Sequence, residues 1–168
     1  MPCKVDQLLT GAIRPYGPNG EVSGYRKYRA TGSIAVTATG LAGDAQADLK
    51  HHGGADKAVL HYAFDHYATW RSERPELQEH FAAPGAFGEN ISTSGCDETS
   101  VCIGDRYTLG SAVVEVSQGR QPCWKLGHRF DCPDMIKAVI ATGRCGWYYR
   151  VVESGSVQVG DTIELTVR

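Results

Sequence analysis

The 168-residue chain has no apolar run near the roughly 18 residues of a membrane-spanning helix. It has no basic excess either: 17 lysines and arginines against 19 aspartates and glutamates give a net charge of −2. That balance argues against bulk electrostatic binding to nucleic acid or to an anionic membrane. The start, MPCKVDQLLTG, lacks the apolar core of a secretory signal. We therefore expect a cytoplasmic protein that binds neither polymeric nucleic acid nor a membrane.

The sequence also lacks any Cys-x-x-Cys pair, the spacing typical of structural zinc sites and of thioredoxin-like redox motifs. In a reducing cytoplasm the thiols stay free. Neither a disulfide scaffold nor a structural zinc site is therefore expected. The six cysteines are Cys3, Cys96, Cys102, Cys123, Cys132 and Cys145.

Short runs of β-branched and aromatic residues that end near glycine dominate the chain and predict strands. Helices are expected at 64–82, interrupted near Pro75, and at 131–143, with Asp131 as N-cap. No βαβ alternation accompanies them. The pattern predicts a single, mainly β domain over residues 1–168, a closed β-barrel with a few peripheral helices. The expected strands lie at 33–38, 57–62, 112–117, 147–152 and 162–167.

One cysteine stands in charged surroundings. The stretch SQGRQPCWKL, residues 117–126, follows the apolar alternation AVVEV and places Cys123 in a loop after a strand. Arg120 and Lys125 are close enough in sequence to stabilise a thiolate. Free cysteine is also among the most buried residue types, so inert packing is an equal alternative from the residues alone.

Two other loops are candidates for binding. In HHGG, residues 51–54, two glycines can turn backbone N–H groups toward an anion, with Lys57 supplying charge. A tight turn with solvated histidines explains the same spacing and is favoured by it. In GAFGENIS, residues 85–92, Glu89 and Asn90 could stand at the lip of a pocket, or simply form a turn into the next strand.

The ordered set of these segments resembles one family, the MOSC domains, which are homologous to the C-terminal domain of molybdenum-cofactor sulfurases. The segments are GLAGD, HHGGADKAVLHY, FGENIS, IGD, VSQGRQPCWKL and GWYYRVV followed by VGD. The likeness covers about residues 30–168 and is strongest to stand-alone bacterial, YiiM-like members. Gly119 departs from the pattern, because the family usually shows proline there.

The resemblance implies a β-barrel that holds the molybdenum cofactor, a phosphate-bearing pterin dithiolene, with Cys123 as catalytic residue and molybdenum ligand. It implies reduction of N-hydroxylated compounds such as 6-hydroxylaminopurine, and thus detoxification of base analogues. Thiolate suits a soft metal–sulfur centre. The residues that we assign to cofactor binding on this basis are His52, Asp56, Lys57, Glu89, Asn90, Arg120 and Lys125.

The chain shows no flavin, haem or iron–sulfur motif, so we expect electrons from a separate reductase. Two other functions fit the same motif. Cys123 could carry a persulfide and hand sulfur to another centre, or the domain could bind the cofactor without turnover.

Overall fold

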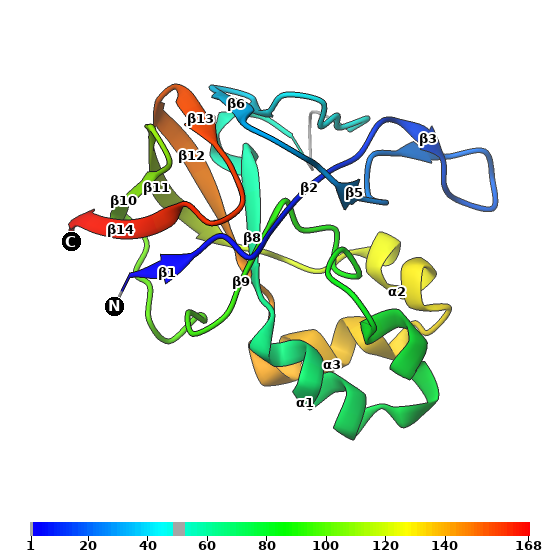
Figure 1. Cartoon of the computed structure of the whole chain (residues 1–168). Helices are drawn as coiled ribbons and strands as arrows, with labels where there is room; N and C mark the ends of the chain where they lie inside the picture. Colours follow the sequence, from blue (N-terminus) through cyan, green and yellow to red (C-terminus); the bar gives the residue numbers. More distant parts are fainter. Residues whose placement is uncertain (1, 49–52) are drawn as a thin grey trace.

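The structure, a computed structural model that describes residues 2–48 and 53–168, is organised around one large sheet (Figure 1). Within the described residues its nine strands run in the order β1-β14-β10-β11-β12-β8-β9-β2-β5. β8 and β9 are parallel, and the other pairs are antiparallel. The strands are β1 (Cys3–Lys4), β2 (Gln7–Thr10), β5 (Tyr28–Arg29), β8 (Val59–Ala63), β9 (Ile91–Thr93), β10 (Arg106–Leu109), β11 (Ala112–Gly119), β12 (Trp147–Glu153) and β14 (Thr162–Val167).

The prediction of a closed barrel is wrong for the described chain, whose sheets are open. No strand pairing joins the two ends of the large sheet, β1 and β5. The N-terminal segment nevertheless serves both sides of the sheet, because β1 pairs with β14 and β2 pairs with β9. The chain changes partner at Val5, which donates to the Asp161 carbonyl, and at Asp6, which donates to the Ser92 carbonyl. Because of this change of partner, β1 and β2 are separate strands and do not form one continuous strand between β14 and β9.

The described residues also form two smaller sheets. β6 (Ile34–Thr37) lies between β13 (Gly155–Val157) and β7 (Gly40–Leu41). A hairpin of β3 (Arg14–Pro15) and β4 (Val22–Ser23) lies apart from it, on the side of the molecule that also carries α2 (Figure 1).

The helices gather at one end of the molecule (Figure 1). The helix expected at 64–82 is present as α1 (Asp65–Glu73) and the 3-10 helix η2 (Pro75–Phe81), broken at Arg74 before the proline. No helix within residues 2–48 and 53–168 is long and apolar enough to cross a membrane. The other helical segments are η1 (Ala55–Lys57), α2 (Trp124–Phe130) and α3 (Asp134–Thr142).

The expected start of the helix at 131–143 is wrong. Asp131 does not cap α3; it ends α2 in the left-handed conformation, with φ 48°, and donates its N–H to the Gly127 and His128 carbonyls. Asx side chains tolerate this conformation, which explains the residue type. Gly143 follows α3 with φ 70°, as expected of a helix C-cap.

Two apolar clusters meet at β8, whose five residues are all buried. Val59 and Leu109 belong to the cluster inside the large sheet. Tyr62, Trp70 and Phe87 belong to a second cluster that packs the helices against the sheet. β8 therefore fixes the helical end relative to the sheet.

A histidine lies inside the sheet. His61 on β8 is fully buried, with Nδ1 3.1 Å from the Tyr149 hydroxyl and Nε2 2.7 Å from Thr93 Oγ1. Burial lowers the pKa of His61 to about 3, so the imidazole is neutral in the folded protein.

We predict that His61 makes the protein less stable in acid. Below the ordinary imidazole pKa of about 6.5 the unfolded chain takes up a proton that the folded chain refuses. This stability is complete above that value and is lost as the pH falls toward about 3, with a slope approaching about 1.4 kcal/mol per pH unit. Urea unfolding at several pH values should show a shallower loss in His61→Gln. Parallel curves for the two proteins would contradict this account.

Candidate functional site

A short loop between β11 and α2 carries Arg120 and Cys123 to the wall of a cavity that opens to solvent. Cys123 is the N-cap residue of α2, has an extended backbone and is partly exposed. The cavity has a volume of about 60 Å³. Arg120, Cys123, Lys125 and Asn90 all line it, so four of the residues assigned from the sequence come together here.

Three cationic side chains line this cavity. Arg120 is 4% exposed and Lys125 is 7% exposed. Lys27 also lines it and is paired with Asp44, which in addition accepts the Gly11 N–H at 2.8 Å. Burial lowers the pKa of Lys27, although Asp44 opposes the shift. Within residues 2–48 and 53–168 neither Arg120 nor Lys125 forms an ion pair with a carboxylate, so the cavity wall keeps an excess of positive charge.

The guanidinium of Arg120 is only partly satisfied. Nη2 donates to the Tyr25 hydroxyl at 3.1 Å and to the Phe87 carbonyl at 3.2 Å. Nη1 is buried and has no hydrogen-bond partner among the described residues. Burial acts to lower the pKa of Arg120, but the phenols of Tyr25 and Tyr148 and the Cys123 thiol raise it, and the net shift is upward. A buried charge with an unused donor favours an incoming anion.

Two phenols complete the wall near the cysteine. Tyr25 and Tyr148 both line the cavity. Burial raises the pKa of Tyr25 to about 12, against the opposing effect of Arg120, and burial likewise raises the pKa of Tyr148. Both therefore stay protonated at neutral pH and can donate hydrogen bonds into the cavity.

The part of the wall that comes from the N-terminal segment was not predicted from the sequence. The Tyr16 hydroxyl donates to the Lys125 carbonyl at 2.7 Å, and its ring lies 5.5 Å from Tyr25 and 5.0 Å from His128. These contacts hold the β3–β4 hairpin against α2 and bring Tyr25 and Lys27 to the cavity. The alternation of aromatic and basic residues in SGYRKYR, residues 23–29, is the one local signal that marks this segment.

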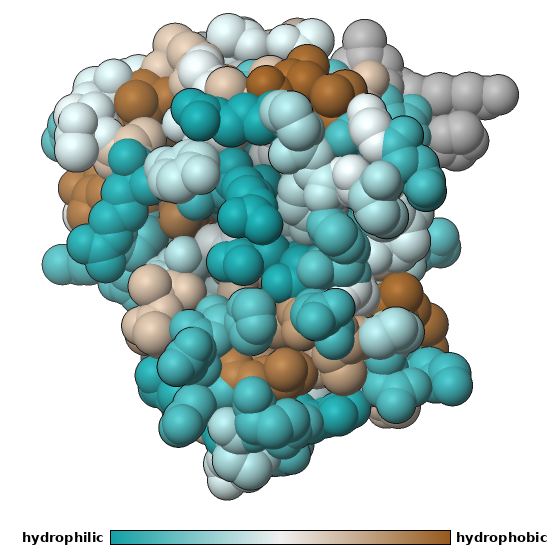
Figure 2. Space-filling view, turned by 90° about the vertical axis from the view of Figure 1, so that its right-hand side faces the viewer, coloured by the Kyte–Doolittle hydropathy of each residue, from teal (hydrophilic) through white to brown (hydrophobic). Residues whose placement is uncertain are grey.

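Figure 2 shows the side of the molecule on which this hairpin and α2 lie. Hydrophilic residues predominate across its middle, with apolar patches above and below. This side of the molecule is therefore mixed in polarity.

Glu89 and Asn90 brace the turn that they belong to. Glu89 is fully buried, accepts the Tyr67 hydroxyl at 2.5 Å and the Gly85 N–H at 2.7 Å, and does not line the cavity. Asn90 lines the cavity, but its side chain accepts the Leu60 N–H at 3.0 Å and donates to the Leu9 carbonyl at 3.2 Å. The oxygen and the nitrogen of the Asn90 side-chain amide are thus both used to hold strands together.

The HHGG region is described only in part. His51 and His52 lie outside the described residues. Asp56 forms an ion pair with Arg150, with 3.0 Å between Oδ1 and Nε, and its side chain is 63% exposed. Lys57 does not line the cavity as described, although its carbonyl accepts a hydrogen bond from Gln46, which does.

Comparisons with known proteins match most of this chain. The model of the MOSC domain matches residues 48–164. Protein YiiM of Escherichia coli is 44% identical over 161 residues, which cover 96% of this chain and 71% of that protein. A protein named "Reductase" from Gibberella moniliformis is 42% identical over 164 residues, 96% of this chain but only 29% of that longer protein.

A solved structure points the same way. The crystal structure of YiiM from Escherichia coli superposes with a TM-score of 0.81 and 36% identity, over 100% of this chain and 71% of that one. The MOSC domain is the type found at the C-terminus of molybdenum-cofactor sulfurases, which links the chain to that cofactor. The family match over most of the chain, together with this identity to YiiM, shows that the chain belongs to the MOSC domain family.

Proposed function

We propose that this chain binds the molybdenum cofactor with Cys123 as a metal ligand and reduces N-hydroxylated compounds such as 6-hydroxylaminopurine. The observation that carries the proposal is the convergence of a partly exposed thiol with the buried cations Arg120 and Lys125 on one cavity. The relative named "Reductase" and the family's link to the cofactor favour a redox role over simple anion binding.

The residues present fit such a cofactor. Thiolate is a ligand that soft metal–sulfur centres prefer, and Arg120 Nη1 offers an unused donor to an anionic group. Among the described residues no group of three or more His, Cys, Asp and Glu side chains could hold a metal ion. A metal at Cys123 must therefore bring most of its own ligands, as a dithiolene cofactor does. A cavity of about 60 Å³ would hold only one end of such a ligand.

The bound cofactor would supply two-electron redox chemistry. Arg120 would hold an anionic group by charge-assisted hydrogen bonds, and Lys125 would add a point charge. Tyr25 and Tyr148 would offer O–H groups to the oxygen that leaves nitrogen, since conversion of an N-hydroxyl group to an amine and water consumes two protons and two electrons. The electrons are proposed to come from a separate reductase protein.

We predict that Cys123→Ser loses turnover and keeps its fold. A hydroxyl is a poor substitute for thiolate on a soft centre, and Cys123 is not part of either apolar cluster. The assay is amine formation from 6-hydroxylaminopurine by cofactor-loaded protein with a chemical reductant, with thermal melting as the folding check. Cys102→Ser, at an exposed cysteine outside the cavity, is the matched control and should behave as wild type.

The same assay separates the other functions. Near-normal turnover in Cys123→Ser would contradict the ligand assignment. Wild-type protein that retains cofactor without any turnover would be a binding module. A persulfide on Cys123 in protein without molybdenum, detected by mass spectrometry, would indicate a sulfur carrier.

We predict that Arg120 sets the charge selectivity of Cys123 in protein without cofactor. Iodoacetate and iodoacetamide attack the same sulfur and differ in charge, so the ratio of their rates reports the local potential and cancels changes in access. Arg120→Ala should lower the iodoacetate-to-iodoacetamide ratio at Cys123 on the order of tenfold, the effect of about 1.4 kcal/mol, and Arg120→Lys should lower it less. Peptide mapping follows both Cys123 and the exposed Cys102, whose ratio should not move. An unchanged ratio at Cys123 would show that Arg120 is not part of the anion site.

A further inference from the structure

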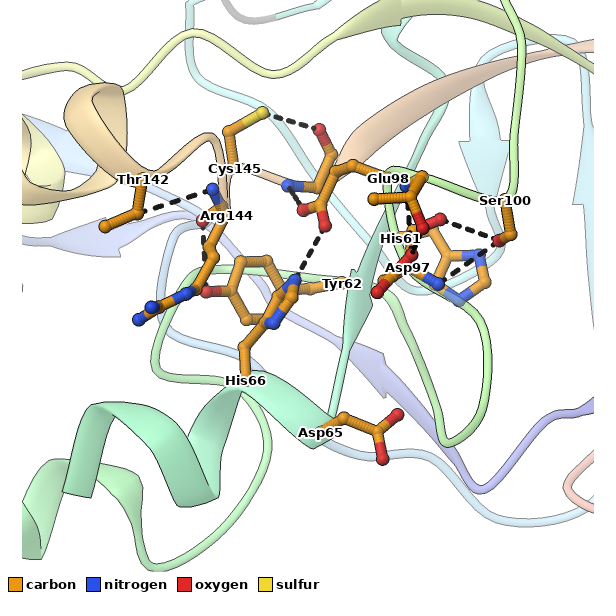
Figure 3. Close-up of polar contacts among 12 residues, drawn as sticks. His61, Tyr62, Asp65, His66, Asp97, Glu98, Ser100, Thr142, Arg144 and Cys145 are labelled. Atoms are coloured by element: carbon orange, nitrogen blue, oxygen red, sulfur yellow. Dashed lines mark hydrogen bonds and ion pairs between the residues drawn. The ribbon is translucent and has the colours of Figure 1, made fainter. Parts of the chain in front are cut away.

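The loop that joins α3 to β12 binds the backbone of Arg120 from outside the cavity. Its backbone N–H donates to the Gly146 carbonyl at 3.0 Å. The thiol of Cys145, which is partly exposed, donates to the same carbonyl at 3.3 Å (Figure 3). The position of the Gly146 carbonyl therefore helps to set where the Arg120 loop lies.

The N–H of Gly146, which belongs to the preceding peptide group, is held by a carboxylate. Glu98 Oε1 accepts the Gly146 N–H at 2.6 Å, and Glu98 Oε2 lies 2.6 Å from His66 Nε2 on α1 (Figure 3). The side chains of His66 and Glu98 are 13% and 22% exposed. Burial acts to raise the pKa of Glu98, but the hydrogen bonds from His66 and Gly146 lower it overall, so the group is a carboxylate at neutral pH.

Residue 146 has little freedom to move away from these partners. Gly146 has φ +73°, a conformation that side chains disfavour, and a Cβ there would lie 2.4 Å from the His61 carbonyl oxygen. Its N–H and its carbonyl are both used, by Glu98 and by Arg120. The two peptide groups that meet at the Gly146 Cα are thus each held by one of these contacts, and they are coupled through the φ and ψ of Gly146.

We propose that Glu98, held by His66, is a positioning residue for Arg120, because it binds the N–H of Gly146, the residue whose carbonyl accepts the Arg120 N–H. Neither Glu98 nor His66 lines the cavity, so binding there would depend on a hydrogen-bonded pair behind it. This inference rests on the proposed anion-binding role of Arg120 and adds the residues that set its geometry.

The test compares variants of Glu98 by the iodoacetate-to-iodoacetamide ratio at Cys123 in protein without cofactor. Glu98→Ala and Glu98→Gln remove the same negative charge, which by itself would raise the ratio. Only Glu98→Gln keeps an oxygen that can accept the Gly146 N–H. We expect Glu98→Ala to lower the ratio roughly two- to fivefold, the scale of one hydrogen bond, and Glu98→Gln to restore it.

A matched control comes from the same loop. Glu73 binds Arg144 through two hydrogen bonds of 2.7 and 2.8 Å and so ties this loop to α1 without touching the Gly146 peptide. Glu73→Ala should melt at a lower temperature and keep the wild-type ratio. Should Glu98→Ala not fold, His66→Ala, which leaves the carboxylate without its support, is expected to lower the ratio.

The outcomes separate this inference from the proposed function. If Arg120→Ala lowers the ratio and Glu98→Ala does not, positioning by Glu98 is wrong and the anion site stands. An equal fall in Glu98→Ala and Glu98→Gln, or an equal fall in Glu73→Ala, would also overturn the positioning role. If Arg120→Ala leaves the ratio unchanged, the anion site itself fails.

Discussion

The buried charge of Arg120 is the constraint on which the rest of the site depends. A guanidinium taken out of water is costly unless its donors are paired, and one of its nitrogens has no partner among the described residues. Three separate segments of chain hold Arg120: the Tyr25 hydroxyl and the Phe87 carbonyl accept from its guanidinium, and the Gly146 carbonyl accepts its backbone N–H. A site built this way is arranged before its ligand arrives, which favours tight capture of an anion beside Cys123.

The sequence could predict the part of the site that is local in the chain. Arg120, Cys123 and Lys125 lie within six residues of one another, so a single loop brings them together. Tyr25 and Lys27 could not be found in this way. They reach the cavity through tertiary packing, such as the bond from the Tyr16 hydroxyl to the Lys125 carbonyl, which spans 109 positions of the sequence.

Glu89 and Asp56, which the sequence suggested as cofactor-binding residues, have carboxylates that bind other parts of the chain. The carboxylate of Glu89 is consumed by the hydroxyl and N–H groups of its own turn and of α1, and Asp56 is paired with Arg150. Nothing in the sequence distinguishes a carboxylate that braces a turn from one that lines a pocket. Burial and partners decide this, and both are set by the fold.

The fold, like the site, has parts that the sequence predicts and parts that it does not. Runs such as those in β11 and β14 were predicted because their residue types alone favour strands. α2 was missed because it has only seven residues and contains Gly127, so its helical pattern is short and weak. That the large sheet is open could not be predicted either, because the change of partner at Val5 and Asp6 depends on contacts with distant strands.

The central claim is that this chain holds the molybdenum cofactor at Cys123. The most direct measurement is the molybdenum and pterin content per chain of wild-type protein purified from a host that makes the cofactor. The account predicts that both approach equimolarity with the chain. Folded protein in which both stay at the level of an unrelated protein from the same host would contradict it.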